Sequence, residues 1–386
     1  MDDLAIVGGG PAGCMAAALL AKDHSVSVLE EHAVTGLPAQ CTGLVSERVL
    51  RLAGTDCPVQ NSIYGARLHF PGGGVLKIGG KDRKAVVIDR AEFDQLLAAK
   101  AMDAGAEFHY SHRVIDSSVH EDGARIRTNG RKEEFQARLV VGADGPRSVI
   151  GQALGNNEPK EWLRGYQVDL DLPPSDPKFV DIYVGSERAP GFFAWALPGD
   201  DFTRVGLCVP MDREPPSTYL RRLLRELKLE DEKVLRNHGG LIPMGGRPRS
   251  YGERTLLIGD AAGQVKPVSG GGLQPGLTSA RCLETVARRA LAEDRLDARS
   301  LSEYEKLWQR RLGRELRNGY RLRRIYTRVG DEEMDEVFQM VNKEDILEIL
   351  SEGDIDHPSS LAPPLLRHLP SLLRFSPRLL LQMLIP

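Results

Sequence analysis

The sequence of 386 residues is poor in cysteine and shows no pattern of metal ligands. Its five cysteines are scattered, odd in number and without a C-x-x-C pair. This argues against a disulfide framework or a zinc site and fits a reducing cytoplasm. The nine histidines show no H-x-x-x-H or H-E-x-x-H spacing, so we predict no metal site.

Long apolar runs and an excess of basic residues are also missing. No stretch of about 18 apolar residues occurs, so we predict no transmembrane helix. The apolar N-terminus begins with Asp2 and Asp3 and is interrupted by glycines, which is unlike a secretory signal. The formal net charge is −3, so nucleic acid is not an expected partner. We expect a cytoplasmic globular protein with room for two or three domains.

The most informative stretch is the glycine-rich sequence LAIVGGGPAG at residues 4–13. Residues 4–7 are apolar and predict a buried parallel strand, after which Gly8, Gly10 and Gly13 form G-x-G-x-x-G. In such a turn the first glycine permits the tight bend. The second lets the backbone approach a pyrophosphate, and the third allows the helix to pack closely on the strand.

The residues that follow complete a dinucleotide-binding unit. Residues 16–21 predict a helix, whose N-terminus offers free N–H groups and a positive dipole to phosphates. Residues 26–29 predict a second strand ending in Glu30, where a carboxylate is placed to bind a ribose hydroxyl. A glycine turn alone is common, but this order of elements predicts dinucleotide binding.

Two later segments repeat the pattern of a buried strand that runs into glycine. LVVGADG ends in Asp144 and Gly145, and TLLIGDAAG delivers Asp260, whose carboxylate is placed to bind a sugar hydroxyl. A further helix follows, and its N–H groups are placed to face a flavin edge and stabilise negative charge on reduced flavin. This helix opens at Gly271, Gly272 and Leu273.

Strand-rich and helix-rich stretches alternate in the rest of the chain. We predict short strands over 67–89, a helix over 91–105, and strands with two hairpins over 107–142. Further predictions are antiparallel strands over 164–209 with a strand at 190–198, a helix over 216–237, a buried strand over 254–260, and mainly helix from 273.

In this order the three glycine segments resemble the FAD fingerprints of the para-hydroxybenzoate-hydroxylase-like flavoproteins. The sequence VIDRAEFD also resembles that superfamily's strand-to-helix segment, and this nominates Arg90 as an FAD contact. A surface salt bridge is the alternative for Arg90.

Within that superfamily the chain is most similar to geranylgeranyl reductases, especially archaeal ones that act on membrane lipids. QCTGLVS at 40–46 resembles the family's cysteine–glycine segment, and PGFFAWALP at 190–198 resembles its P-x-x-Y-x-W-x-F-P motif. The chain departs from the motif at Phe193, where the family has tyrosine, and at Leu197, where it has phenylalanine.

The resemblance implies an FAD-dependent oxidoreductase acting on CH–CH groups. It would saturate isolated double bonds of geranylgeranyl chains on archaeal-type membrane ether lipids, by hydride transfer from N5 of reduced flavin. Such an alkene is unactivated, so its site needs a strong hydride donor, a dry aligned pocket and a proton source. NAD(P)H, a ferredoxin and a deazaflavin all remain open as electron donor.

Three alternative functions stay open. The first is a reductase of geranylgeranyl diphosphate or another prenyl carrier. The second is an FAD-dependent aromatic monooxygenase of the same fold. The third is a flavin electron-transfer module.

The resemblance also implies a set of site residues. Cys41 is a candidate proton relay or shape residue, although free cysteines are usually small buried hydrophobes. The aromatic segment is a candidate alkene pocket, although aromatic side chains mostly fill cores. Lys266 is a candidate to attract a phosphate group or to stabilise anionic flavin, and the alternative is an ordinary solvent-exposed lysine. The catalytic set is Cys41, Phe193 and Trp195, and the substrate pocket is Phe192, Phe193, Trp195 and Pro267. The cofactor set is Gly8, Gly10, Ala12, Gly13, Glu30, Cys41, Gly43, Arg90, Asp144, Gly145, Asp260, Gly271, Gly272 and Leu273.

The expected fold class is α/β (α+β multidomain). A Rossmann-like FAD-binding domain is predicted together with an antiparallel-sheet substrate domain and a helical C-terminal region. The predicted boundaries are 1–60, 84–160 and 250–300 for the first, 61–83 and 161–249 for the second, and 301–386 for the third.

The C-terminal region has two unusual compositions. Residues 308–328 hold eight arginines against one acid, which by itself is typical of a solvated helix face. Residues 361–386 hold ten leucines, three arginines and no acid. This segment is expected either to pack as a helical cap or to lie on the inner face of a membrane as a peripheral contact.

Overall fold

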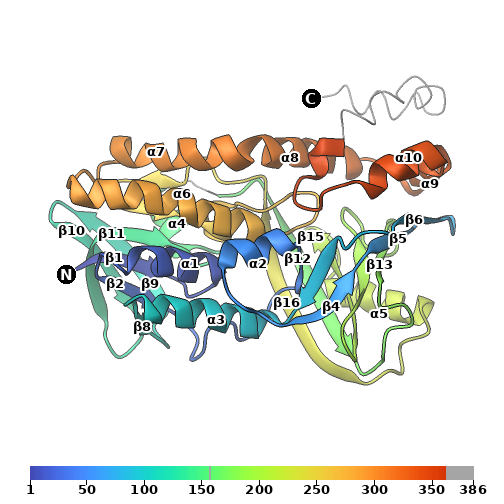
Figure 1. Ribbon diagram of the computed structural model, residues 1–386, viewed down its shortest axis with the longest axis horizontal. Helices are drawn as coiled ribbons and strands as arrows, with labels where there is room; N and C mark the ends of the chain where they lie inside the picture. Colours follow the sequence, from blue (N-terminus) through green and yellow to red (C-terminus); the bar gives the residue numbers. More distant parts are fainter. Residues whose placement is uncertain (156–157, 362–386) are drawn as a thin grey trace.

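The computed structural model describes residues 1–155 and 158–361. An eight-stranded sheet lies at the N-terminal end of an elongated molecule, and a seven-stranded sheet lies at the other end (Figure 1). The predicted membrane contact through 361–386 falls outside the described residues from position 362 on. Among the described helices, none is long and apolar enough to cross a membrane.

The eight-stranded sheet is parallel at its centre, where the order is β18-β11-β1-β2-β8. Val7, the last residue of β1, pairs with Leu29 of β2 and Gly142 of β11, and Gly142 pairs with Leu257 of β18. The carboxyl ends of four strands therefore meet at one edge, so the segments after them lie side by side. The strands are β1 (Asp2–Val7), β2 (Val26–Leu29), β8 (Glu107–His109), β9 (Val114–His120), β10 (Gly123–Thr128), β11 (Glu134–Gly142), β17 (Tyr251–Gly252) and β18 (Thr255–Leu257).

Both faces of this sheet are covered, because side chains along each strand alternate between them. Leu4 and Ile6 of β1 join a core with helices α1 (Pro11–Leu20), α3 (Arg90–Asp103) and α6 (Leu273–Ala292). Ala5 and Val7 of the same strand face the β9–β10 hairpin and helix α4 (Val149–Ala153). The predicted β-α-β unit and the helix from residue 91 are confirmed.

The seven-stranded sheet has the order β16-β12-β15-β14-β13-β5-β6 and is antiparallel except where β13 pairs with β5. Helix α5 (Pro216–Glu226) packs on it through β12 and β15. A small third sheet, β3-β7-β4, lies between the two larger ones in the view of Figure 1. The remaining strands are β3 (Leu44–Val45), β4 (Val59–Ile63), β5 (Gly65–His69), β6 (Val75–Gly79), β7 (Ala85–Ile88), β12 (Glu161–Leu170), β13 (Phe179–Tyr183), β14 (Ala194–Pro198), β15 (Thr203–Pro210) and β16 (Val234–Met244).

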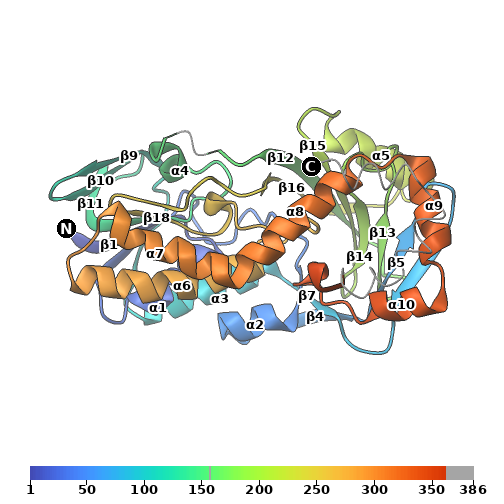
Figure 2. The same ribbon diagram turned by 90° about the horizontal axis from the view of Figure 1, so that it is seen from above.

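The described part of the chain after α6 is mainly helical, as expected, and connects the two large sheets. Helix α7 continues through a π-helical turn, η2, into α8, and this rod runs from the first sheet toward the second (Figure 2). A short helix α2 (Glu47–Ala53) packs beside α6. The remaining helical elements are α7 (Ala298–Trp308), η2 (Gln309–Gly313), α8 (Arg314–Tyr326), α9 (Asp331–Val341), α10 (Glu344–Ser351), the 3-10 turn η1 (Gly259–Ala262) and η3 (Pro358–Leu361).

Three predicted boundaries are wrong. The helix over 216–237 ends at Glu226, because the chain from Val234 enters β16 and pairs with β12 instead. The strand over 190–198 begins at residue 194, because Gly191 has a φ of +74° and turns the chain before it. The strand over 254–260 ends at residue 257, because Gly259 has a φ of +64° and opens η1.

The glycine turn after β1 yields a direct test of packing. A Cβ atom on Gly13 would lie 2.1 Å from the carbonyl oxygen of Gly8, whereas Gly10 has nothing within 4 Å. We expect Gly13→Ala to lower the free energy of unfolding by at least about 2 kcal/mol, because α1 must move off β1. Gly10→Ala is the control and should change it by less than about 0.5 kcal/mol. Chemical denaturation of both variants checks this, and equal stabilities would contradict it.

Candidate cofactor and substrate site

The first glycine turn and Glu30 meet at the carboxyl edge of the parallel strands. A Cβ on Gly8 would lie 2.3 Å from the carbonyl oxygen of Ala143, so β1 and the segment after β11 touch there. The amide of Gly9 donates to Glu30 Oε2 at 2.7 Å, and the His32 ring contacts Glu30 Oε1 at 2.7 Å. Glu30 is therefore fixed beside the glycine turn, as predicted from its place after β2.

Asp144 has local partners for both of its carboxylate oxygens. Ser148 Oγ donates to Oδ1 at 2.5 Å, and the amide of Val149 donates to Oδ2 at 2.7 Å. Burial raises the pKa of Asp144, although these hydrogen bonds oppose the rise. The side chain thus fixes the start of α4 at the strand edge, while Gly145, with a φ of +73°, has no atom near its Cβ position.

The Asp260 carboxylate, in contrast, receives no hydrogen bond from the residues that the structure describes. It lies at the N-terminus of α6, since a Cβ on Gly272 would be 2.6 Å from Asp260 Oδ1. Burial raises the pKa of Asp260 to about 6, and the charge of Arg90 only partly opposes the rise. Ala12 of α1 comes close to η1, 3.0 Å from a Cβ placed on Gly259. The first and third glycine segments therefore adjoin.

Arg90 lies between Asp94 and Cys41. Its guanidinium forms two 3.0 Å hydrogen bonds with the Asp94 carboxylate one helical turn away. Burial opposes the charge on Arg90, but Asp94 and the neighbouring Cys41 outweigh that effect and raise the pKa of Arg90. The predicted alternative of an ion pair is thus present, but it is a buried pair that also faces Cys41 and Asp260.

Three side chains of the seven-stranded sheet hold the backbone around Cys41. Gln167 Nε2 donates to the carbonyl of Cys41 at 3.0 Å, and Arg204 Nη1 donates to the carbonyl of Thr42 at 2.5 Å. His238 Nδ1 lies 2.8 Å from the carbonyl of Ala39. We call Gln167, Arg204 and His238 the carbonyl clamp.

Asp169 fixes the orientation of Arg204 in the carbonyl clamp. Its carboxylate binds Arg204 through two hydrogen bonds of 2.6 and 2.8 Å, and both side chains are buried. Burial alone would raise the pKa of Asp169, but the hydrogen bonds from Arg204, together with the nearby His238 ring, lower it to about 2. A buried carboxylate that stays ionised keeps Arg204 in the geometry that reaches Thr42.

Gly43 completes the attachment of this segment to its surroundings. Its φ is +77°, and a Cβ there would lie 2.3 Å from the carbonyl oxygen of Ile88 at the end of β7. Glycine is therefore required for the Cys41 segment to pass beside β7, directly before Arg90.

Trp195 lies on the same face of the sheet as the carbonyl clamp. Trp195, Gly206 and Gln167 are paired across β14, β15 and β12. A Cβ on Gly206 would be 2.4 Å from Gln167 Cβ and 2.7 Å from the Trp195 ring, so the two side chains meet above this glycine. Trp195 Nε1 and Gln167 Oε1 are buried without a hydrogen-bond partner in the described structure.

The other predicted aromatic residues adjoin the third glycine segment. Phe192 and Phe193 are stacked with ring centroids 4.3 Å apart, and Phe193 meets Trp195 edge to face at 6.1 Å. A Cβ on Gly270 would lie 3.6 Å from Phe192. Pro267, predicted in the same pocket, packs against Gly319 of α8.

Lys266 is neither solvated nor directed at a free anion. Its Nζ binds Asp356 Oδ1 at 2.8 Å and the carbonyl of Ile355 at 3.1 Å, and both charged side chains are buried. Asp356 Oδ2 also accepts from Ser46 Oγ at 2.5 Å and Arg48 at 3.1 Å. One carboxylate thus connects the Cys41 segment, the third glycine segment and the loop after α10.

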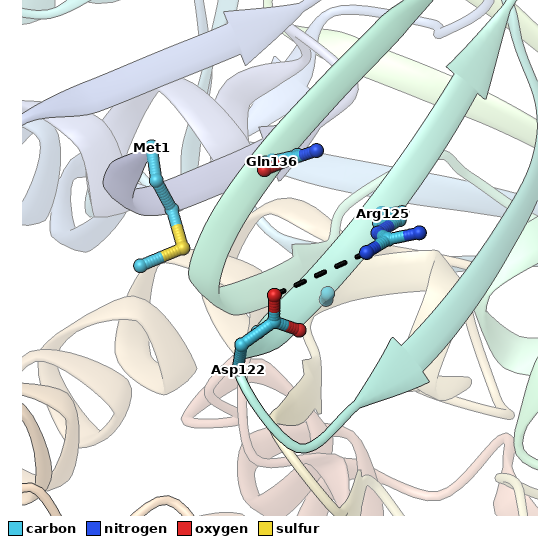
Figure 3. Close-up of a pocket in the computed structure, with 6 residues that line it drawn as sticks. Met1, Asp122, Arg125 and Gln136 are labelled. Atoms are coloured by element: carbon cyan, nitrogen blue, oxygen red, sulfur yellow. Dashed lines mark ion pairs between the residues drawn. The ribbon is translucent and has the colours of Figure 1, made fainter.

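Two surface hollows contribute no comparable chemistry. One is a shallow dip, open to solvent, at the β9–β10 hairpin, where Arg125 and Asp122 are 3.9 Å apart (Figure 3). The other, of about 390 Å³, is lined by residues 108–112 and Arg131, next to the end of β2 that carries Glu30.

Sequence reasoning did not find the carbonyl clamp, Asp169 or Asp356. The clamp residues come from three strands far from Cys41 in the chain, with no recurring spacing that would connect them. Asp356 lies in a short loop of ordinary polar composition.

Fold and site together define a flavoprotein oxidoreductase class. A halogenase, PltM, solved with FAD has a TM-score of 0.71 to this structure at 16% identity, covering 99% of this chain and 85% of that one. A geranylgeranyl bacteriochlorophyll reductase-like protein from Thermoplasma acidophilum has a TM-score of 0.84 at 23% identity, covering 97% and 98%.

Residues 3–329 match the family described as lycopene cyclase protein. Digeranylgeranylglycerophospholipid reductase 1 of Methanopyrus kandleri is 32% identical over 325 residues, which are 80% of this chain and 86% of that protein. The chain belongs to the geranylgeranyl reductase family, and the lycopene cyclase family model spans the same flavoprotein framework.

The raised pKa of Asp260 predicts a pH-dependent stability. An ionised carboxylate in this buried place opposes folding, so the penalty grows as the pH rises from the unfolded-state pKa through about 6. In cofactor-free protein we expect Asp260→Asn to have a higher free energy of unfolding than the wild type. This difference should grow by up to about 3 kcal/mol between pH 4 and pH 8. Urea unfolding at both pH values measures this gain, and the exposed Asp201→Asn is the control. A gain that is independent of pH would refute the prediction.

The carbonyl clamp predicts that Asp169 controls access to Cys41. Asp169→Asn removes the counter-ion of Arg204, so its hold on Thr42 weakens and alkylation of the Cys41 thiol accelerates about ten-fold. The other four cysteines are buried, so iodoacetamide labelling of native protein reports on Cys41. Asp181→Asn breaks a comparable ion pair with Arg67 in the same sheet and is the matched control. Equal acceleration of alkylation in both variants would indicate general loosening of the sheet and would contradict the prediction.

Proposed function

We propose that this protein is an FAD-dependent reductase that saturates isolated double bonds of geranylgeranyl chains on archaeal-type membrane ether lipids. One observation carries the proposal. Trp195 lies on the sheet face that holds the Cys41 segment, the Phe193 ring lies against Trp195, and Phe192 adjoins the glycine segment before α6. An apolar wall next to a thiol and a flavin-type turn suits an alkene that carries no polar handle.

The residues present fit FAD. Helices α1 and α6 both begin at glycine without a side-chain cap, so their N-terminal amides are available to a pyrophosphate and to the flavin ring. The open space at Gly10 admits a phosphate, and the Asp260 carboxylate has no competing hydrogen bond from the described residues. Glu30 at the end of β2 is placed for a ribose hydroxyl.

FAD in its reduced form supplies the hydride for such a reaction. The protein then has to exclude water, align the alkene and provide a proton to the second carbon. Phe193 and Trp195 form the apolar wall. The Cys41 thiol is the proposed proton donor, and the Arg90 guanidinium lies beside it. The carbonyl clamp fixes the backbone on both sides of Cys41.

The test is an anaerobic turnover with a matched pair of cysteine variants. Protein reduced with dithionite is mixed with digeranylgeranylglycerophospholipid, while flavin reoxidation and product mass are followed. We expect reoxidation with mass gains in steps of two hydrogens. Cys41→Ala should slow reoxidation by about 100-fold or more, because it removes the proton donor. Cys282→Ala, buried in α6, should leave the rate unchanged.

Other outcomes of the same experiment would support one of the alternative functions. Reduction of geranylgeranyl diphosphate in place of the phospholipid identifies a different carrier. Flavin that reoxidises only with oxygen and hydroxylates an aromatic compound indicates a monooxygenase, and transfer to a protein without a small product indicates an electron-transfer module. A normal rate in Cys41→Ala leaves Cys41 as a shape residue. Supplying NAD(P)H, ferredoxin or reduced deazaflavin in place of dithionite identifies the electron donor.

A further inference from the structure

Helix α8 and the π-turn η2 before it carry a row of arginines on one face. Arg310, Arg314, Arg317 and Arg321 recur at intervals of four, three and four residues, and all four are exposed. This spacing places side chains on one side of a helix. The row spans about 17 Å at 1.5 Å per residue. We call these four residues the arginine row.

The arginine row gathers four positive charges on one helix face. Its members have no ion pair or hydrogen bond with any residue that the structure describes. Arginines elsewhere are widely paired, for example Arg67 with Asp181 and Arg188 with Glu226. The one acid within the row, Glu315, instead accepts from the amide of Ser359. Residues 362–386 contain no Asp or Glu that would neutralise it.

The opposite face of α8 covers the candidate substrate site. Gly319 packs on Pro267, and Arg323 is buried, donating to the carbonyl of Gly191 at 3.0 Å beside the Phe192 ring. Tyr326 donates to the carbonyl of Phe192. One helix therefore has its inner face on the aromatic wall and its outer face charged, along one long edge of the molecule (Figures 1 and 2).

We propose that the arginine row binds the phosphate head groups of an anionic lipid bilayer. Guanidinium groups form bidentate hydrogen bonds with phosphate, and a straight row offers several of them to a flat surface at once. Leu322, which follows Arg321 and lies on the flank of the same helix, is 39% exposed and apolar, which suits a bilayer surface better than an acidic protein. The ten leucines and three arginines of 361–386 favour the same partner. The inference rests on the proposed function only in taking the substrate to be a membrane lipid.

Vesicle co-sedimentation of the full-length, FAD-loaded protein tests the inference. The vesicles are phosphatidylcholine, with or without about one-third phosphatidylglycerol. We expect binding only to the anionic vesicles, weakening as salt rises. Arg317→Glu with Arg321→Glu should weaken it at least about ten-fold. The control is Arg221→Glu with Arg225→Glu, two exposed arginines at the same spacing on α5, which should change binding by less than about two-fold.

The outcomes separate the inference from the proposed function. Unchanged vesicle binding in the Arg317 and Arg321 variant, or equal binding to neutral vesicles, overturns the inference. Normal vesicle binding combined with slower electron transfer from an acidic donor protein assigns the row to that protein instead and also overturns it. Turnover of detergent-dispersed lipid is measured in parallel. Its absence in the wild type speaks against the proposed function and leaves the membrane contact standing.

Discussion

The close crossing of β1, α1 and the segment after β11 is the constraint on which the rest of the structure depends. Gly8 and Gly13 leave no room for a Cβ against the Ala143 and Gly8 carbonyls. This contact fixes the register in which the carboxyl ends of β1, β2, β11 and β18 meet. Glu30, Asp144 and Asp260 are neighbours only because that register brings their strands to one edge. Backbone contact, rather than any charged pair, therefore positions these three carboxylates.

The second half of the site is ordered by charge instead. The buried Asp169–Arg204 pair reaches across from the seven-stranded sheet and holds the carbonyls around Cys41. A buried ion pair contributes little net stability, but it is directional, and removing one partner costs several times what the intact pair contributes. The position of the backbone around Cys41 thus depends on the Asp169–Arg204 ion pair, which the fold alone would not require.

The sequence predicted the parts of this arrangement that depend on residues close together in the chain, and it missed the parts that depend on contacts between distant residues. The three glycine segments, Glu30 and the first helices follow from spacing within about 30 residues, where strand and helix periods are readable. β16 was missed because it is an edge strand whose first residues are exposed, so it shows no alternation of apolar and polar residues. The carbonyl clamp was missed because the register between strands is a long-range property, and Lys266 was misread because its partner lies 90 residues later.

The Asp356 carboxylate has a consequence for how the protein is made. Lys266 and Ser46 are both buried against a residue that leaves the ribosome 90 residues after the lysine and 310 after the serine. A buried ammonium group without its counter-ion is costly, so the turn that carries Lys266 stays incomplete until residue 356 has been synthesised. The emergence of Asp356, and not the earlier emergence of the glycine segments, is then the event after which this turn assumes its final form.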